Sequence, residues 1–169
     1  MSPVPNLTFS DARLEDAQVL AALRTTVADH LTSEFGRGHW SSVVSETGVL
    51  RDLKTSKVIV ARQGSRIIGT LRFATRKPWA IDPAFFTQVP RPLYLTDMAV
   101  LPTLQRQGVG ERLLAHAEEA ARVWPGDAIR LDAYAGPAGA GPFYARCGYR
   151  EVAQVTYRRV RLVYYERLL

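Results

Sequence analysis

The segment from Leu93 to Val123 joins a β-rich run to a helical pattern through a turn that contains two glycines. The run is Leu93–Val100 (LYLTDMAV), and the apolar residues after Val109 are spaced three and four apart: Leu113, Leu114, Ala117, Ala121 and Trp124. Gly108 and Gly110 lack a Cβ atom, so the backbone there can approach a ligand closely and adopt strained dihedrals. The first amides of a helix lack intrahelical acceptors, and its dipole favours negative charge. The segment therefore predicts a phosphate site.

Two other phosphate-binding motifs do not fit this turn. A dinucleotide fingerprint requires a glycine where Leu113 stands, and a P-loop requires Gly-Lys-Ser/Thr where Gly110-Glu111-Arg112 stand. A Gly-x-Gly sequence before a helix also occurs in turns that only connect two elements. The turn alone leaves both interpretations open, a phosphate site and a structural turn.

The run from Met98 to Leu114 covers the end of the strand, the turn and the start of the helix, with the sequence MAVLPTLQRQGVGERLL. It resembles the cofactor-binding motif of the GCN5-related N-acetyltransferase (GNAT) superfamily, whose pattern is Arg/Gln-x-x-Gly-x-Gly/Ala. Gln105, Gly108 and Gly110 occupy the three motif positions. The resemblance implies that this turn binds the pyrophosphate of acetyl-coenzyme A (acetyl-CoA).

A second motif follows the next β-rich run, Ile129–Tyr134. It is the sequence FYARCGY at residues 143–149, a short helix that ends at Gly148. This segment is similar to the later Phe-Tyr and Gly-Phe/Tyr motif of the same family. Both motifs occur in the family's order, and the order of elements extends the resemblance to most of the chain. Pro137 departs from the family, which often has asparagine there, so the resemblance does not define the path of the pantetheine arm past residues 135–142.

The remaining patterns predict the other elements. Strands are predicted at residues 6–12, 57–62, 66–73, 93–100, 129–134, 152–157 and 160–168. Helices are predicted from Leu14 to the glycines at 36 and 38, over roughly Ser41–Leu53, over Val109–Val123, and over Phe143–Cys147. This order indicates the α/β (α+β) class, with a mixed, mostly antiparallel central sheet flanked by helices, and the resemblance implies its GNAT-like form. A chain of 169 residues can bury one core, so we expect a single domain over residues 1–169.

The charge balance is basic. Lysine and arginine outnumber aspartate and glutamate by 22 to 16, which gives a formal charge of +6. This balance favours an anionic partner, and a nucleotide cofactor satisfies it as well as DNA or RNA would. The basic residues are scattered arginines without a dense block, so we do not expect nucleic acid as a partner.

Further expectations concern location and metal binding. Cys147 is the only cysteine, so no disulfide forms within the chain. The start at residues 1–5 lacks the basic and apolar regions of a signal peptide, which together with the lone thiol favours a cytoplasmic location. No run approaches the roughly 18 apolar residues of a membrane helix, so we expect no membrane partner. His30, His39 and His116 lie far apart and in no HExxH motif, so we expect no metal site.

The resemblance implies a cofactor path along the strand at residues 93–100, with the pyrophosphate on the amides of residues 107–111. It also implies direct transfer of the acetyl group to a primary amine in a ternary complex, with no acyl-enzyme. The amide of Val100 is a candidate donor to the oxygen that becomes negative, and Arg106 is a candidate phosphate contact. The candidate cofactor-binding residues are Met98, Val100, Gln105, Arg106, Gln107, Gly108, Val109, Gly110, Glu111 and Tyr144.

Two side chains are candidates for catalysis. Tyr144 matches the family's general-acid tyrosine. A phenol with a pKa of about 10 is a weaker acid than a thiol at about 8.5, so we expect a hydrogen bond that strengthens as charge develops on the leaving sulfur. Asp97, in the cofactor strand, is the candidate base, and Glu46 or water are alternatives. Both residues also have structural interpretations, Tyr144 as a half-buried aromatic and Asp97 as a carboxylate bonded to backbone or arginine.

These observations predict an N-acetyltransferase, with a non-catalytic acyl-CoA-binding or sensor module on the same fold as the alternative. The acceptor stays open among a small amine, an antibiotic, a peptide N-terminus and a lysine side chain. Trp79, Phe85 and Phe86 lie in the proline-rich loop at residues 76–92, where they either line the acceptor pocket or cap the core. The resemblance also implies a homodimer.

Overall fold

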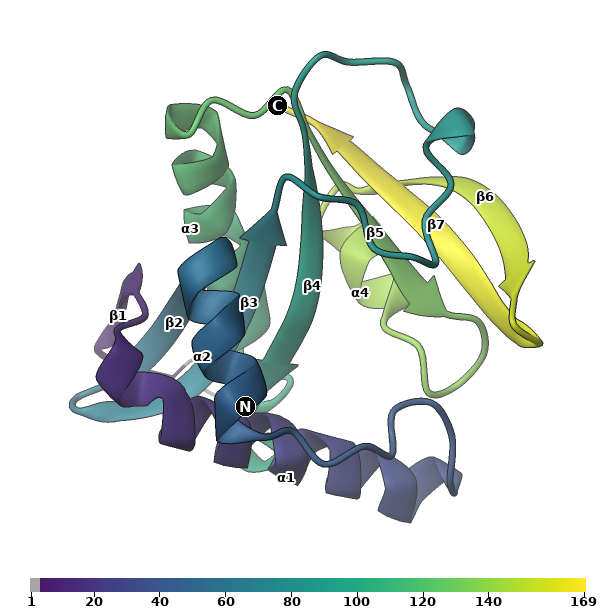
Figure 1. Cartoon of the computed structure of the whole chain (residues 1–169). Coiled ribbons are helices and arrows are strands. Elements are labelled where there is room, and N and C mark those ends of the chain that lie inside the picture. The colour runs from purple at the N-terminus through teal and green to yellow at the C-terminus, as the bar shows by residue number, and fades with distance from the viewer. Residues whose placement is uncertain (1–3) are drawn as a thin grey trace. The chain divides into compact units, whose positions relative to one another are not determined.

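The computed structural model describes residues 4–169, in which helices and strands follow one another as Figure 1 shows. The strands are β1 (Leu7–Asp11), β2 (Lys57–Gln63), β3 (Arg66–Ala74), β4 (Pro92–Val100), β5 (Ala128–Tyr134), β6 (Arg150–Tyr157) and β7 (Val160–Leu168). The helices are α1 (Ala17–Phe35), α2 (Glu46–Thr55), α3 (Val109–Val123) and α4 (Gly141–Arg146). Short 3-10 turns are η1 (Leu14–Asp16), η2 (Pro83–Phe85) and η3 (Pro102–Leu104).

The strands form a seven-stranded sheet in the order β1-β2-β3-β4-β5-β7-β6. The neighbours β1–β2, β2–β3, β5–β7 and β7–β6 are antiparallel, whereas β4 and β5 are parallel. The parallel ladder pairs residues 92–94 with residues 128–130. The predicted mixed, mostly antiparallel sheet with flanking helices is therefore confirmed.

Contacts within the chain divide it into two compact units. The first contains the described residues up to Phe73 together with Thr96–Ala117, and the second contains Ala74–Leu95 and Glu118–Leu169. Strand β4 and helix α3 contribute residues to both units. The single domain over residues 1–169 stays a prediction.

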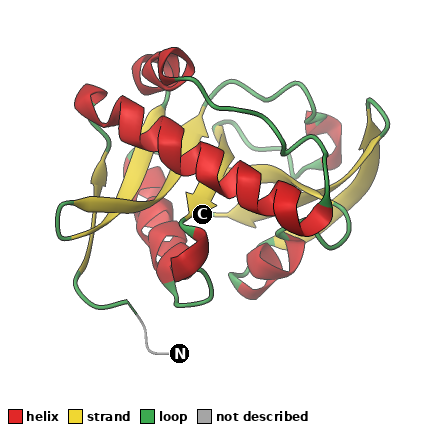
Figure 2. Cartoon of the chain, turned by 90° about the horizontal axis from the view of Figure 1, so that it is seen from below, coloured by secondary structure: helices red, strands yellow, loops and turns green. Residues whose placement is uncertain are grey.

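The core of the first unit forms between two helices and the strands. Its buried side chains come from α1, α2, β2, β3 and β4 and include Leu20, Leu23, Val49, Val58, Val60, Ile67 and Ala99. Helix α1, the long helix in Figure 2, thus buries the apolar positions that its three- and four-residue spacing predicts. It ends at Gly36, whose φ of +77° suits a residue without a Cβ and whose N–H donates to the Thr32 carbonyl at 2.9 Å.

Helix α2 begins later than the sequence pattern predicts. It spans Glu46–Thr55, rather than roughly Ser41–Leu53. The reason is a cap, because the Ser45 side chain accepts the Gly48 N–H at 3.1 Å and satisfies an amide that has no acceptor inside the helix. Residues 41–45 therefore precede the helix.

Two hairpins join strands predicted from the sequence, β2 with β3 and β6 with β7. Gly64 lies in the turn between β2 and β3 with a φ of +60°. Arg158 and Arg159 form the two-residue turn between β6 and β7, with φ of 48° and 67°. Left-handed backbone at both central residues matches the right-handed twist of the flanking strands. Arginine is a poor residue for that conformation, so the turn carries local strain.

In the second unit, strand β7 places Tyr164 and Tyr165 on opposite faces of the sheet, because side chains alternate along a strand. Tyr164 stacks on Phe86 of the loop between β3 and β4, with ring centroids 5.3 Å apart. Tyr165 instead contacts Tyr144 of α4, at 6.2 Å. The loop and the helix therefore cover opposite faces of β7 (Figure 1).

The strain at the β6–β7 turn can be tested by replacing Arg158-Arg159 with Asn-Gly, the pair that favours two left-handed residues. We expect the double substitution to stabilise the protein by about 1 kcal/mol, because relief of two left-handed arginines exceeds the entropic cost of glycine. In thermal unfolding this corresponds to a Tm increase of about 2–4 °C for a chain of this size. An unchanged or lower Tm would show that the turn is not strained.

Candidate functional site

The turn before α3 has the backbone of an anion site. Its residues 105–108 follow η3 directly, and two of them are left-handed: Arg106 with a φ of 59° and Gly108 with a φ of +78°. The first helical hydrogen bond runs from the Arg112 N–H to the Gly108 carbonyl, at 3.1 Å. The amides of residues 109–111 thus have no acceptor within the helix. They lie at the positive end of the α3 dipole, where they can bind an anionic group.

Two glutamine side chains hold the turn in shape. Gln105 Nε2 donates to the Val100 carbonyl at 3.1 Å, which ties the first motif position to the end of β4. Gln107 Nε2 donates to the Thr103 carbonyl at 3.0 Å. Val109 is buried and anchors the first turn of the helix. These bonds organise the turn before any ligand arrives.

The other predicted residues divide between the two units. All candidates from Asp97 to Glu111 belong to the first unit, whereas Tyr144 belongs to the second. Within the turn, Arg106 and Glu111 are exposed, and Gly108 has open space where a Cβ would point. The left-handed φ of this position, rather than close packing around it, therefore explains why it is a glycine.

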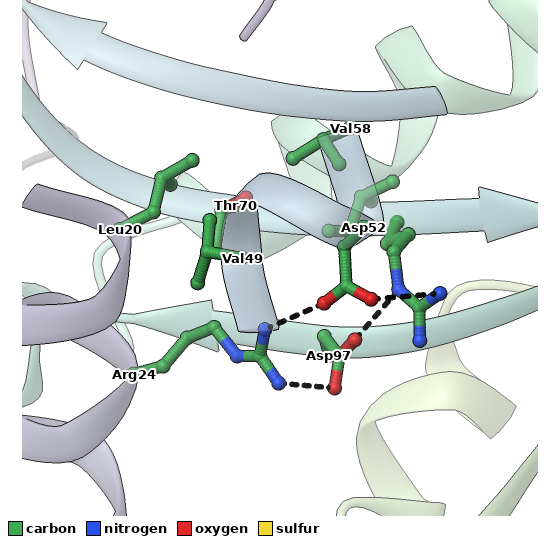
Figure 3. Close-up of a pocket in the computed structure, with 9 residues that line it drawn as sticks. Leu20, Arg24, Val49, Asp52, Val58, Thr70 and Asp97 are labelled. Atoms are coloured by element: carbon green, nitrogen blue, oxygen red, sulfur yellow. Dashed lines mark hydrogen bonds and ion pairs between the residues drawn. The ribbon is translucent and has the colours of Figure 1, made fainter. Parts of the chain in front are cut away.

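Asp97 lies in a ring of four charges, which we call the charge quartet: Arg24 of α1, Asp52 of α2, Arg72 of β3 and Asp97 of β4 (Figure 3). Asp97 Oδ1 accepts from Arg24 Nη2 and Asp97 Oδ2 accepts from Arg72 Nε, both at 2.7 Å. Asp52 closes the ring, at 3.3 Å from Arg24 and 3.5 Å from Arg72. The four side chains are 20–24% exposed and border a small pocket whose apolar walls are Leu20, Val49, Val58 and Leu71.

The quartet gives Asp97 the structural role considered from the sequence, a carboxylate paired with arginine. Both of its oxygens accept charge-assisted hydrogen bonds, and a proton on either oxygen would disrupt one of them. Its backbone is left-handed, with a φ of 55° in the middle of β4. The catalytic role of Asp97 stays a prediction.

Tyr144 is buried on α4 among aromatic rings. Its ring lies 5.2 Å from Phe143 and 5.8 Å from Tyr149, both edge to face. Burial raises the pKa of the Tyr144 phenol above its ordinary value, and the neighbouring Asp132 and Cys147 raise it further. The phenol therefore stays protonated at neutral pH and can donate a hydrogen bond. Helix α4 approaches β7 closely because Gly141 has no Cβ to strike the Tyr165 hydroxyl.

Asp132 of β5 is a candidate functional residue that the sequence analysis missed. Its half-buried carboxylate forms no hydrogen bond or ion pair with another side chain of residues 4–169. Burial raises the pKa of this carboxyl group. A half-buried carboxylate without a partner in the fold is a candidate for binding a ligand. The one signal in the sequence was a carboxylate inside the β-rich run AIRLDAY.

The structural role of Asp97 predicts a loss of stability on its removal. We expect Asp97→Ala to lower the free energy of unfolding by about 1–3 kcal/mol, because it leaves two partly buried guanidinium groups without their acceptor. Asp11→Ala is the matched control: Asp11 pairs with Lys57 at 2.8 Å, but its side chain is 68% exposed. Asp11→Ala should lower the free energy of unfolding by less than about 1 kcal/mol. Urea unfolding of both variants measures the difference, and equal losses would contradict the quartet's role.

Among residues 4–169, no helix is long and apolar enough to cross a membrane. The same part of the chain holds no group of three or more metal-ligating side chains placed to share an ion.

Solved structures of acetyltransferases superimpose on nearly the whole chain. Ribosomal-protein-alanine N-acetyltransferase from Brucella melitensis is 18% identical with a TM-score of 0.75, over 96% of this chain and 99% of that one. PaiA N-acetyltransferase from Thermoplasma acidophilum, in complex with coenzyme A, is 13% identical with a TM-score of 0.75, over 97% and 99%. The yncA protein from Salmonella typhimurium, with acetyl-CoA, is 17% identical with a TM-score of 0.70, over 96% and 94%. At these identities the likeness shows the fold.

Sequence comparison identifies the family. No curated protein sequence matches this chain. The model of the acetyltransferase (GNAT) domain matches residues 54–151, which include the turn before α3, Asp132 and Tyr144. The match covers more than half of the chain and agrees with the fold and with both sequence motifs. The chain therefore belongs to the GNAT family of acetyltransferases.

Proposed function

We propose that the protein transfers the acetyl group of acetyl-CoA directly to a primary amine in a ternary complex. The observation that carries the proposal is the turn at residues 105–108, where two left-handed residues precede a helix whose first amides have no internal acceptor. Acetyl-CoA supplies a thioester that an amine can attack and a pyrophosphate that such a turn can bind. We assign the pyrophosphate to the amides of residues 107–111 and a further phosphate contact to Arg106.

The residues of this chain have three tasks in the proposed reaction. The amides at the start of α3 hold the phosphates, and the N–H of Val100 donates to the carbonyl oxygen as it becomes negative. The Tyr144 phenol donates a hydrogen bond to the sulfur as the thiolate departs. Its raised pKa keeps the phenol protonated, so this donor is present at neutral pH. Water or a nearby carboxylate takes the proton of the amine. The paired geometry of Asp97 makes it a weaker candidate base than the sequence alone indicated.

We also propose a cytoplasmic enzyme that acts on a small-molecule or peptide amine. The lone cysteine, which can form no disulfide within the chain, supports the location. A homodimer remains an expectation from the family resemblance, and no nucleic acid is assigned as a partner.

The phosphate turn can be tested with Gly108→Glu and calorimetric titration of acetyl-CoA. We expect the native protein to bind and the variant to lose binding, since the substitution strains a φ of +78° and places a carboxylate beside the phosphates. Gly64→Glu is the matched control, because Gly64 has a φ of +60° and equally open surroundings but lies in the β2–β3 turn. Absence of binding by the folded native protein would withdraw the proposal. Binding without turnover of any amine would favour the acyl-CoA sensor.

The role of Tyr144 can be tested with Tyr144→Phe. We expect acetyl-CoA affinity to be retained and kcat to fall by about 10²-fold, the lower range for loss of a hydrogen bond to developing negative charge. Tyr149→Phe removes a hydroxyl from the adjacent ring of the same cluster and controls for changes in packing. Release of free coenzyme A thiol measures turnover of all three proteins. Equal kcat values would remove Tyr144 from the mechanism.

A further inference from the structure

The second unit contains an open pocket whose walls are largely aromatic. It has a volume of about 470 Å³ and lies between residues 77–85 of the loop before β4 and the strands β6 and β7. Its aromatic lining is Trp79, Phe85, Tyr157 and Tyr164. The Trp79 side chain is 81% exposed and that of Phe85 is 50% exposed. The volume and the lining are typical of a small-molecule site.

The wall formed by the loop is fixed by Tyr164. The Tyr164 hydroxyl donates to the Ala80 carbonyl and accepts the Asp82 N–H at 3.2 Å. Its ring stacks on Phe86 at 5.3 Å and meets the edge of Phe85 at 5.9 Å. These contacts hold the loop against β7, so the pocket is formed before a ligand binds. A preformed site avoids the cost of ordering the loop during binding.

The charged side chains of the pocket are already engaged within the loop. Lys77 Nζ donates to the Ile81 carbonyl at 3.2 Å, and Asp82 Oδ1 accepts the Ala84 N–H at 3.0 Å. Their opposite charges offset one another at the rim. The ring faces therefore dominate the interior, which suits an aromatic or similarly bulky apolar group.

Asp132 of β5 is the cross-strand neighbour of Tyr164, which lines the pocket. The register of β5 and β7 pairs Asp132 directly with Tyr164, which places both side chains on the same face. The next charged residue on that face, Arg130, already has partners within the chain. It donates to the Thr87 carbonyl at 2.6 Å and lies 3.6 Å from Glu166. Asp132 has no such partner among residues 4–169. A half-buried carboxylate without a partner gains from a cationic ligand, as a hydrogen-bonded ion pair offsets its lost hydration.

We propose that the acceptor is a primary amine on an aromatic body, whose ring binds in the pocket of Trp79, Phe85, Tyr157 and Tyr164 and whose ammonium group binds Asp132. This inference rests on the proposed N-acetyltransferase function and names its substrate class. Tyr164 joins the two parts of the site, since it forms a wall of the pocket and is the cross-strand neighbour of Asp132. Paired Cβ atoms on neighbouring strands are about 4.5–5.5 Å apart, so the Asp132 and Tyr164 side chains leave the sheet side by side.

The experiment compares tryptamine with tryptophol, which has the same ring and chain but a hydroxyl in place of the ammonium group. Calorimetric titrations use the full chain, alone and saturated with coenzyme A. We expect tryptamine to bind at least 10-fold more tightly than tryptophol. Asp132→Asn should abolish this preference and leave tryptophol binding unchanged, whereas Trp79→Ala should weaken both ligands about equally. Trp124→Ala, at a tryptophan 38% exposed outside the pocket, should change neither affinity.

The possible results separate this inference from the function on which it rests. Thermal unfolding confirms that each variant is folded. Equal binding of the two ligands, no binding of either, or a preference that survives Asp132→Asn would overturn the proposed acceptor class, even where acetyl-CoA binds. Unchanged binding in Trp79→Ala would place the ring elsewhere and overturn the pocket assignment. The expected amine binding without any affinity for acetyl-CoA would instead overturn the transferase function and retain the amine site.

Discussion

The pairing of Asp97 with Arg24 and Arg72 is the interaction on which the first unit depends. A non-glycine residue with a left-handed φ of 55° inside a strand costs about 1–3 kcal/mol and persists only where the surroundings hold it. Here two bonds of 2.7 Å from guanidinium groups hold the side chain of that residue. The same arginines also lie beside Asp52 on α2, so one ring of charges joins two helices to the strand that leads into the phosphate turn. Local strain in β4 is thus offset by contacts that also assemble the fold.

The sequence predicted the parts of this protein that local rules determine. Apolar spacing located α1 and α3, and Gly108 marked a turn, because glycine adopts a left-handed φ without a steric cost. The start of α2 was misplaced because three serines precede Glu46, and only the structure shows that Ser45 provides the cap. Two β-rich runs separated only by Arg158-Arg159 predicted the hairpin there, but not its left-handed backbone, since arginine is not typical of that conformation.

The roles of two acids, Asp97 and Asp132, depend on residues distant from them in the sequence. Asp97 is separated from Arg24 by 73 positions and from Arg72 by 25, so no motif links them. From the sequence alone, a catalytic base and a carboxylate paired with arginine are therefore both open roles for Asp97. Asp132 is a single acid in a β-rich run, and its importance lies in what surrounds it. Whether a carboxylate has a partner is a property of the folded chain, set by strand register and by which charges on its face are already paired.

Alternation along β7 separates two chemical tasks within the second unit. Tyr165 faces α4 and supports Tyr144, on the side assigned to the departing thiolate, whereas Tyr164 faces the aromatic pocket and Asp132. The formal charge of +6 favours an anionic cofactor at long range but repels a protonated amine. At physiological salt that field decays within about 8 Å, so a carboxylate in direct contact can reverse the preference locally. For the proposed amine acceptor, an acid without a partner in the fold would supply that local preference, and we assign this role to Asp132.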